Sequence, residues 1–434
     1  MVINTLLMGK PGSHPVETAS VLLKNLYWLE RETMRILAGH LFVVADFTVK
    51  YELPKHIWQD SLRADKLRSR VMEMRFPRRD VDQKPEAPFG RLVNLLSLAA
   101  NEHELIEGVY RLTKSMIAEA YDAYIALADT LDDAPTLMLI GTFAFEIREQ
   151  IKASFILTQQ LGKLGTIDPQ WKQGVEEALA ECRKMLGISA LFSSDATIEV
   201  ERPQLLLPMV PARGPEFGLA KYFYPIHDWG DSLMEKQIMA ALSHANELWA
   251  AEITAKVMWE WDDMPWEFYM DCARWSYDEI RHSHMGIRRL AEWGLKVGED
   301  YCIFPEPFVC LHDQSTFAIF ALLHRMELNA PGAKSVMKAY FEEEGDTATS
   351  QSIDYDWADE SIHLLYGHKW SLHRLGGDMD ELDEWKENMH DLYWQRRREL
   401  LMTWDYEPYR GRIMQRLEHL RANGLQSGEA ADHA

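Results

Sequence analysis

Two copies of one acidic motif, 81 residues apart, constrain this sequence more than any other feature. The copies read Asp278-Glu279-Ile280-Arg281-His282 and Asp359-Glu360-Ser361-Ile362-His363. In each copy the glutamate and the histidine are three residues apart, so on a helix they share one face with Cβ atoms roughly 5–6 Å apart. Each copy can therefore bind one metal ion through a carboxylate and an imidazole.

A lone glutamate precedes each motif at nearly the same distance. Glu247 stands 32 residues before Glu279, and Glu327 stands 33 residues before Glu360. This spacing corresponds to one helix out, a short turn and one helix back, at about 1.5 Å rise per residue. The sequence therefore predicts that four helical segments meet at one level of a four-helix bundle.

The six side chains form a ligand set for two metal ions. Four carboxylates and two imidazoles suit two iron or manganese ions with open positions, whereas structural zinc favours thiolates. The alternative is a row of salt bridges on helix surfaces, but a His-x-x-Glu sequence before both motifs argues for a site. The predicted metal ligands, which are also the predicted catalytic residues, are Glu247, Glu279, His282, Glu327, Glu360 and His363.

On these motifs, residues 233–375 resemble the ferritin-like di-iron carboxylate superfamily, in the branch of acyl desaturases, bacterial multicomponent monooxygenases and ribonucleotide reductase small subunits. The resemblance implies that Glu247, Glu279 and His282 serve one metal, that Glu327, Glu360 and His363 serve the other, and that Glu279 and Glu360 bridge. Asp278 and Asp359 would each accept the second ring N–H of a ligating histidine. Ile362 stands where the family often has arginine, so only Arg281 is expected to pair with these aspartates.

Three further residues near the motifs have more than one interpretation. His244 and His324 lie one turn before the lone glutamates. They are either additional ligands or, as we favour, histidines that support the ligands from behind. Glu252 competes with Glu247, but it is only 27 residues from Glu279, so Glu247 is preferred.

Composition excludes several classes of protein. A formal charge of −22 and a pI near 5.2 argue against nucleic acid or an anionic membrane as partner, and permit a basic redox partner. The four cysteines form no C-x-x-C pair, which fits a reducing cytosol. The sequence shows no secretion signal, no run of 18 apolar residues and no glycine-rich phosphate loop, so we expect a cytoplasmic protein that binds no nucleotide cofactor.

Length and helical periodicity predict an all-α protein of several parts. Helical spacing of apolar residues is found at 16–50, 55–75, 88–128, 134–163, 169–187, 232–261, 266–294, 314–343, 351–374 and 379–422. Prolines, including Pro54, are expected to separate the early helices. The predicted parts are an N-terminal helical bundle at 1–197, a proline-rich linker at 198–231, a ferritin-like dimetal bundle at 232–376 and a helical extension with a frayed tail at 377–434.

The N-terminal bundle is predicted to be a degenerate, metal-free copy of the second. Asp65-Lys66-Leu67-Arg68-Ser69 aligns with the first motif, with Glu30 or Glu32 upstream in the place of the lone glutamate. In this alignment Lys66 and Ser69 replace the metal ligands, and a lysine there would repel a cation. Partial matches of this kind also arise between unrelated amphipathic helices.

Together these features predict a non-haem di-iron oxidoreductase. The cofactor would be two iron ions, with manganese or a mixed manganese–iron pair as the alternative, and the enzyme would use O2 as an oxidase or oxygenase on a small organic molecule. Electrons would come from the substrate or from a separate donor protein, and a small homo-oligomer such as a dimer is expected. The alternatives are ferritin-type iron storage and a peroxide-consuming enzyme like manganese catalase.

Overall fold

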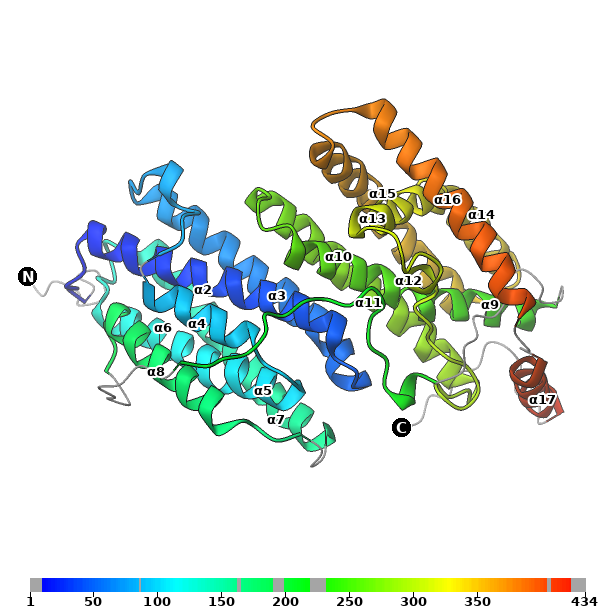
Figure 1. Ribbon diagram of the computed structural model, residues 1–434, viewed down its shortest axis with the longest axis horizontal. Helices are drawn as coiled ribbons and strands as arrows, with labels where there is room; N and C mark the ends of the chain where they lie inside the picture. Colours follow the sequence, from blue (N-terminus) through cyan, green and yellow to red (C-terminus); the bar gives the residue numbers. More distant parts are fainter. Residues whose placement is uncertain are drawn as a thin grey trace, which may run out of the picture. The chain divides into compact units, whose positions relative to one another are not determined.

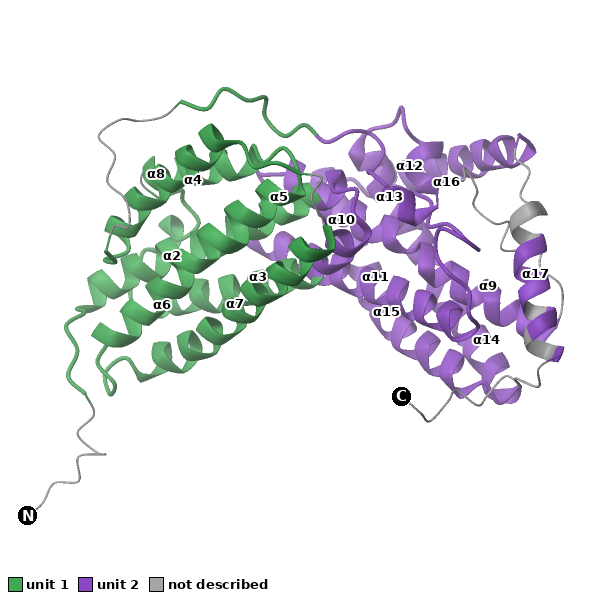
Figure 2. Cartoon of the chain, turned by 90° about the horizontal axis from the view of Figure 1, so that it is seen from below, with its two compact units in different colours: residues 1–40, 55–206 green, residues 41–54, 207–434 purple. Residues whose placement is uncertain are grey.

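The computed structural model describes residues 10–85, 87–161, 165–189, 199–218, 232–403 and 407–422. The chain divides into two units, shown in Figure 2. Unit 1 consists of Met1–His40 and Lys55–Leu206, and unit 2 of Leu41–Pro54 and Leu207–Ala434. The division falls inside the predicted linker, but unit 2 also contains residues 41–54, which the sequence prediction had assigned to the N-terminal bundle.

The chain is all-helical over the described residues, as predicted, and Figure 1 shows its helices in chain order. The helices between residues 10 and 218 are α2 (Val16–Val43), α3 (Phe47–Glu73), η1 (Arg78–Asp80), α4 (Ala87–Ser97), α5 (Glu102–Leu105), the π-helical η2 (Ile106–Lys114), α6 (Ser115–Leu127), α7 (Ala134–Leu161), α8 (Pro169–Met185) and η3 (Pro215–Phe217). Pro54 does not end a helix as predicted, because α3 continues through it. A proline removes one backbone hydrogen bond, and the packed helix tolerates that loss.

The remaining helices all belong to unit 2. They are α9 (Leu233–Asn246), α10 (Leu248–Glu260), α11 (Trp266–Glu292), α12 (Glu306–Cys310), α13 (Thr316–Glu327), α14 (Ala330–Glu343), α15 (Thr347–Arg374), α16 (Met379–Met402) and α17 (Glu407–Ala422). Side chains fix several of their starts: Ser232 and Glu235 form a capping box on α9, Ser315 caps α13, and Asp346 caps α15.

Several segments predicted as single helices are broken in the structure, and two of the breaks lie at predicted metal ligands. The segment 232–261 is interrupted at Glu247, between α9 and α10. The segment 314–343 is interrupted after Glu327, and α14 then begins with Pro331 in its first turn. Proline suits the first turn of a helix and disfavours helical backbone before it, so Pro331 forces the second break.

Four helices of unit 2 pack in a closed cycle. Helix α10 packs on α11, α11 on α15, α15 on α13, and α13 again on α10. Helix α9 extends the contact with α11, α14 covers α15, and α16 packs on α13 and α12. The cycle places α11 and α15, which carry the two sequence motifs, side by side.

Apolar side chains hold the helices of unit 2 together on one side of the motifs. A buried cluster joins α9 and α11 through Ile238, Leu242, Ala245, Ile280 and Leu290. The polar motif residues therefore lie beside well-packed helices, which fix their positions. No helix in the described ranges has both the length and the apolar character needed to cross a bilayer.

Candidate metal centre

The six predicted ligands converge inside unit 2. Glu279 and His282 project from α11, and Glu360 and His363 project from α15. Glu247 and Glu327 lie at the two helix breaks, the first between α9 and α10 and the second at the last residue of α13. All are buried except Glu247, which is partly exposed.

Glu279 occupies the middle of the site. Its Oε1 lies 3.1 Å from His363 Nδ1, and its Oε2 lies 3.5 Å from His282 Nδ1. Each carboxylate oxygen therefore faces a different histidine, which is the arrangement a bridging carboxylate requires. Trp275 Nε1 fixes the orientation by donating a hydrogen bond of 2.8 Å to Oε1.

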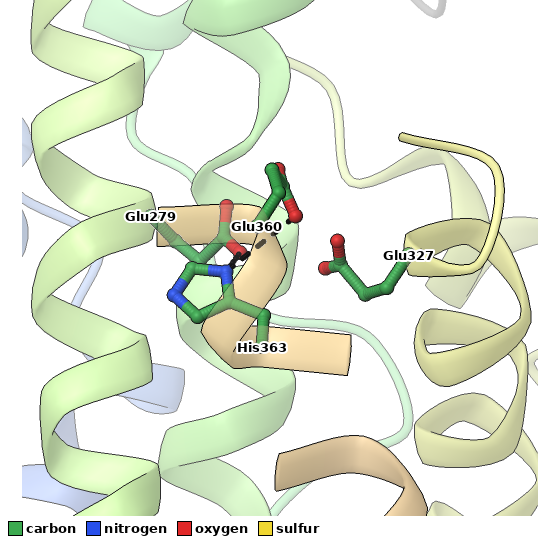
Figure 3. Close-up of side chains that lie close together, drawn as sticks. All are labelled: Glu279, Glu327, Glu360 and His363. Atoms are coloured by element: carbon green, nitrogen blue, oxygen red, sulfur yellow. Dashed lines mark ion pairs between the residues drawn. The ribbon is translucent and has the colours of Figure 1, made fainter. Parts of the chain in front are cut away.

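The six predicted ligands form two overlapping groups, and within each group the ligand atoms lie within 4.8 Å of one another. One group contains Glu279, Glu327, Glu360 and His363; Figure 3 shows these side chains directed toward one another from three helices. The other contains Glu247, Glu279 and His282. Because Glu279 belongs to both groups, the side chains provide two adjacent positions for cations.

The aspartates of the motifs pair with the histidines in a crossed pattern. His282 Nε2 lies 3.3 Å from Asp359, and His363 Nε2 lies 3.4 Å from Asp278. Each aspartate thus supports the histidine of the other motif. With an aspartate accepting at Nε2, the ring keeps its Nδ1 lone pair for the cluster.

Two arginines neutralise this pair of aspartates. Arg281, the predicted partner, contacts Asp278 at 2.5 Å and Asp359 at 3.0 Å. Arg274, which the sequence prediction missed, contacts Asp278 at 2.6 Å and Asp359 at 3.2 Å. Arg274 precedes Asp278 by four residues, and that spacing on a helix was the signal available in the sequence.

Asp356 and Lys334 are also part of the cluster, and the sequence prediction missed both. Asp356 is fully buried one helical turn before Glu360, and its Oδ1 lies 3.6 Å from His282 Nδ1. Lys334, on α14, forms an ion pair with Asp356 and a second one of 3.2 Å with Glu247. The four-residue spacing of Asp356 from Glu360 was the available signal for the aspartate.

His244, His324 and Glu252, whose roles the sequence left open, make different contacts in the structure. His244 Nε2 donates a 2.6 Å hydrogen bond to Asp356 Oδ2, so it supports a carboxylate of the cluster. His324 is in none of the ligand groups found in the described chain; its ring lies 5.9 Å from that of His368. Burial and the nearby Lys386 and His368 lower the pKa of His324 to about 4. Glu252 instead forms a buried ion pair of 2.7 Å with Lys50.

The carboxylates and histidines of the cluster shift one another's pKa values. Burial by itself would lower the pKa of His363, but the hydrogen bond with Asp278 and the negative charge of Glu279 raise it well above its usual value. Burial and the charge of Glu279 raise the pKa of Glu360. For Glu279, burial acts to raise the pKa, but His282 and His363 lower it to about 2. Bound cations would relieve the repulsion between Glu279 and Glu360.

Several buried atoms of the cluster satisfy a further test for metal ligands. Five of them have no hydrogen-bond partner in the described part of the chain: Glu247 Oε2, Asp356 Oδ1, Glu360 Oε2, His282 Nδ1 and His363 Nδ1. Buried polar atoms in proteins are nearly always hydrogen-bonded, so such a concentration requires an explanation. These atoms approach one another at 3.3–3.6 Å without hydrogen-bond alignment, and the residues present therefore fit a pair of metal ions.

A cavity of about 370 Å³ opens onto the cluster. Its wall includes Glu247, Glu279, Glu327 and Glu360, and apolar side chains such as Trp249, Phe304, Leu323 and Met326. On α12 and α16 the wall is polar: Glu306 is buried and accepts hydrogen bonds from Tyr393 at 2.5 Å and Arg397 at 2.6 Å. This volume is at the lower end of the range for small-molecule sites.

Unit 1 has a buried polar network of a different kind. Arg63 on α3 contacts Glu30 on α2 at 2.9 Å, and Lys114 contacts Asp60 at 2.6 Å and Gln150 at 2.7 Å. All of these side chains are buried, so protein cations neutralise the carboxylates here.

The predicted alignment of unit 1 with the first motif is wrong. Lys66 and Ser69 are exposed, so they do not occupy the place of the ligands Glu279 and His282. Asp60 and Arg63 have the same three-residue spacing and face the buried network instead. The predicted positions Lys66 and Ser69 come six residues after the buried Asp60 and Arg63 and lie on the exposed face of α3.

Comparison with known proteins adds one similarity. Residues 192–403, just under half of the chain, are similar to the family described as "Protein of unknown function (DUF455)". No curated protein matches the chain, and no solved structure does. The matched segment contains every residue of the candidate metal centre.

Proposed function

We propose that the protein is a dimetal oxidoreductase that uses O2 to oxidise a small organic molecule. Its unit 2 would be a ferritin-like bundle, with two iron ions as the preferred cofactor. The observation that carries the proposal is Glu279, whose two oxygens face the Nδ1 atoms of His363 and His282 at 3.1 and 3.5 Å. Two imidazoles joined by one carboxylate are the core of a paired metal site.

The donor atoms favour iron or manganese. The groups contain carboxylates and imidazoles, and none of those found in the described residues contains a cysteine. Such hard and borderline donors suit iron and manganese, whereas thiolates would favour zinc or copper. When bound, a pair of redox-active ions with open positions would supply the O2 chemistry.

The chain itself would position the cofactor and the substrate. The crossed pairs His282–Asp359 and His363–Asp278 hold the ring orientation of both ligating histidines. The apolar side chains of the cavity would exclude water from the reacting atoms. The carboxylate of Glu306 and its donors Tyr393 and Arg397 lie in the wall formed by α12 and α16, where they would orient a polar group of the substrate.

The cavity also favours an enzyme over an iron-storage protein. Storage needs only iron and an oxidant, whereas a 370 Å³ cavity with mixed apolar and polar walls beside the ligands suits an organic molecule. We therefore expect a small oligomer that binds two irons per chain and forms no mineral. Electrons beyond those of the substrate would come from a separate donor protein.

Metal content tests the proposal directly. Protein loaded anaerobically with Fe(II) should retain about two ions per chain, because the ligands form one paired site. Glu279→Ala should reduce this number, since that carboxylate faces both histidines. Glu267→Ala, at an exposed position on the same helix, is the matched control and should bind as the wild type does.

The reaction with O2 separates the possible functions. Mixing the loaded protein with O2 should consume about one O2 per pair of ions, and one class of small molecule should change the rate. Uptake of hundreds of irons in a cage-sized particle on size-exclusion chromatography would instead establish storage. Unchanged iron content in Glu279→Ala would refute the metal site.

A further inference from the structure

Asp356 has the properties of a metal ligand outside the six-residue motif set. It is fully buried on α15, and its Oδ1 lies 3.6 Å from His282 Nδ1. Its ligand atoms also group with those of His282 and Glu360, and separately with those of His244 and Glu247, within 4.8 Å. Asp356 therefore faces the same cation position as the predicted ligands of the first motif.

The two oxygens of Asp356 have different surroundings. Oδ2 accepts a hydrogen bond of 2.6 Å from His244 Nε2 and forms an ion pair with Lys334. Oδ1 is buried and has no hydrogen-bond partner among the described residues. One oxygen is thus held from behind by two donors, and the other is left facing His282.

The two carboxylate oxygens of Glu247 also have different surroundings. Its Oε1 contacts Lys334 at 3.2 Å, whereas its Oε2 lies 3.3 Å from His282 Nδ1 and lacks a hydrogen-bond partner within the described chain. Lys334 therefore holds the outer oxygens of both carboxylates. The other oxygen of each carboxylate, Glu247 Oε2 or Asp356 Oδ1, faces His282 Nδ1.

We propose that Asp356 is a seventh protein ligand of the dimetal centre, binding through Oδ1 to the ion beside His282, with Lys334 and His244 as positioning residues. The proposal rests on the proposed function, because it needs the metal pair. Glu247, Asp356 and His282 would hold this ion together with the bridging Glu279 and Glu360. The ion beside His363 would have only Glu327 and His363 in addition to the bridges.

The charge of the cluster agrees with this set of residues. The carboxylates of Glu247, Glu279, Glu327, Glu360 and Asp356 with the ammonium of Lys334 leave four negative charges. Two divalent ions neutralise that charge, and the arginines 274 and 281 separately neutralise Asp278 and Asp359. A buried centre of zero net charge avoids the large cost of uncompensated charge in the interior.

The unequal ligand sets have a functional consequence. An ion with five protein ligands keeps fewer positions for other molecules than an ion with four. The ion beside His363 would therefore be the one that offers positions to O2 or substrate. Glu247 and Glu327 both lie in the wall of the cavity, whereas Asp356, the additional ligand of the ion beside His282, is absent from that wall.

Substitution of Asp356 tests the assignment. In Asp356→Asn the amide oxygen would accept from Lys334 and His244, so the NH2 group, which cannot bind a metal, would face His282. Co(II) titration followed by visible absorption should show two ions in the wild type. The variant should bind one of them at least about 10-fold more weakly, since even loss of an outer partner has an effect of that size. Asp354→Asn, at an exposed position on the same helix, should match the wild type.

The outcomes distinguish this inference from the proposed function. Two Co(II) ions bound to Asp356→Asn with wild-type affinity and spectrum would overturn the seventh ligand and leave the metal pair intact. A wild-type protein that binds no Co(II) pair would refute the proposed function itself.

A crystal structure of the Mn(II)-loaded wild type provides a second test, which needs no variant. Asp356 Oδ1 should lie about 2.0–2.2 Å from one ion, and a separation beyond bonding distance from both ions would overturn the assignment.

Discussion

At the scale of single residues, the crossed pairs of aspartate and histidine link the two motifs. Asp278 lies on α11 but supports His363 on α15, and Asp359 on α15 supports His282 on α11. The packing of α11 against α15 brings each aspartate closer to the histidine of the other motif than to the histidine four residues later in its own motif. Loss of one aspartate should therefore act on the metal position of the other motif.

We predict that Asp278→Asn keeps the fold but weakens binding of the ion beside His363 by roughly 10- to 100-fold. Metal titration with Co(II) measures this. Asp271→Asn is the matched control, because Asp271 is also on α11 and forms an ion pair, but with Lys369. Equal affinities in wild type and Asp278→Asn would show that the aspartate does not support a ligand.

At the scale of helices, the two breaks and one cap determine where the ligands stand. Glu247 and Glu327 lie at the breaks and line the cavity, while α15 carries Glu360, His363 and Asp356 on one continuous helix. Asp346 begins α15: it accepts a hydrogen bond from Thr349 N at 3.0 Å and contacts Gln237 at 2.6 Å and Arg289 at 3.1 Å. This one carboxylate therefore connects α15 to α9 and α11.

We predict that Asp346→Ala lowers the free energy of unfolding by about 2–4 kcal/mol, because a helix cap and a hydrogen bond to a charged group are both lost. Asp378→Ala, which removes the exposed cap of α16, should cost only about 1 kcal/mol. Urea denaturation at neutral pH measures both. Similar losses in the two variants would show that the links from Asp346 to Gln237 and Arg289 contribute nothing.

The difference between wild type and Asp346→Ala should also depend on pH. Burial by itself would raise the pKa of Asp346, but hydrogen bonds from Thr349 and Gln237 and the charge of Arg289 hold it below its usual value. Because this pKa is lower in the folded protein, the stabilisation by the Asp346 carboxylate is complete above about pH 3.9, which is the pKa of aspartate in an unfolded chain. It is lost as the pH falls through the folded pKa. Urea denaturation of both proteins at pH 7 and below pH 4 measures this. The difference in unfolding free energy between wild type and Asp346→Ala should be present at pH 7 and should shrink in acid.

At the scale of the whole molecule, the buried carboxylates of the two units differ in their partners. In unit 1 Arg63 and Lys114 neutralise Glu30 and Asp60, while unit 2 leaves ligand atoms of its cluster without hydrogen-bond partners among the described residues. The internal duplication and the absence of metal from unit 1 both remain predictions, and the ion pairs of Arg63 and Lys114 support the second one. Two fixed cations already occupy the space between the carboxylates.

We predict that Lys114→Met destabilises the protein by about 3–5 kcal/mol, because it leaves a buried carboxylate with one partner fewer. The metal content should stay at two ions per chain. Lys152→Met, which removes an exposed lysine paired with Glu149, should change stability by less than about 0.5 kcal/mol. Chemical denaturation and metal analysis measure these effects, and a third ion bound by the wild type would contradict the prediction.

The sequence by itself determined the features that depend on local periodicity. A three-residue spacing places Glu279 with His282 and Glu360 with His363 on single helical faces whatever surrounds them. The repeated distance to Glu247 and Glu327 then predicted which helices meet, and helical apolar spacing predicted an all-helical chain. These inferences needed only the geometry of one helix and a count of residues between helices.

Tertiary structure decided every feature that depends on which faces meet. The crossed pairing requires one particular rotation of α11 against α15. The contacts of Lys334 with Asp356 and Glu247 require one particular rotation of α14 against α15. The sequence misplaced the inner face of α3, because a helix of mixed polarity offers several similar alignments and only packing selects one. Periodicity fixes the relation between residues on one helix, but the rotation of a helix against its neighbours depends on all the side chains between them.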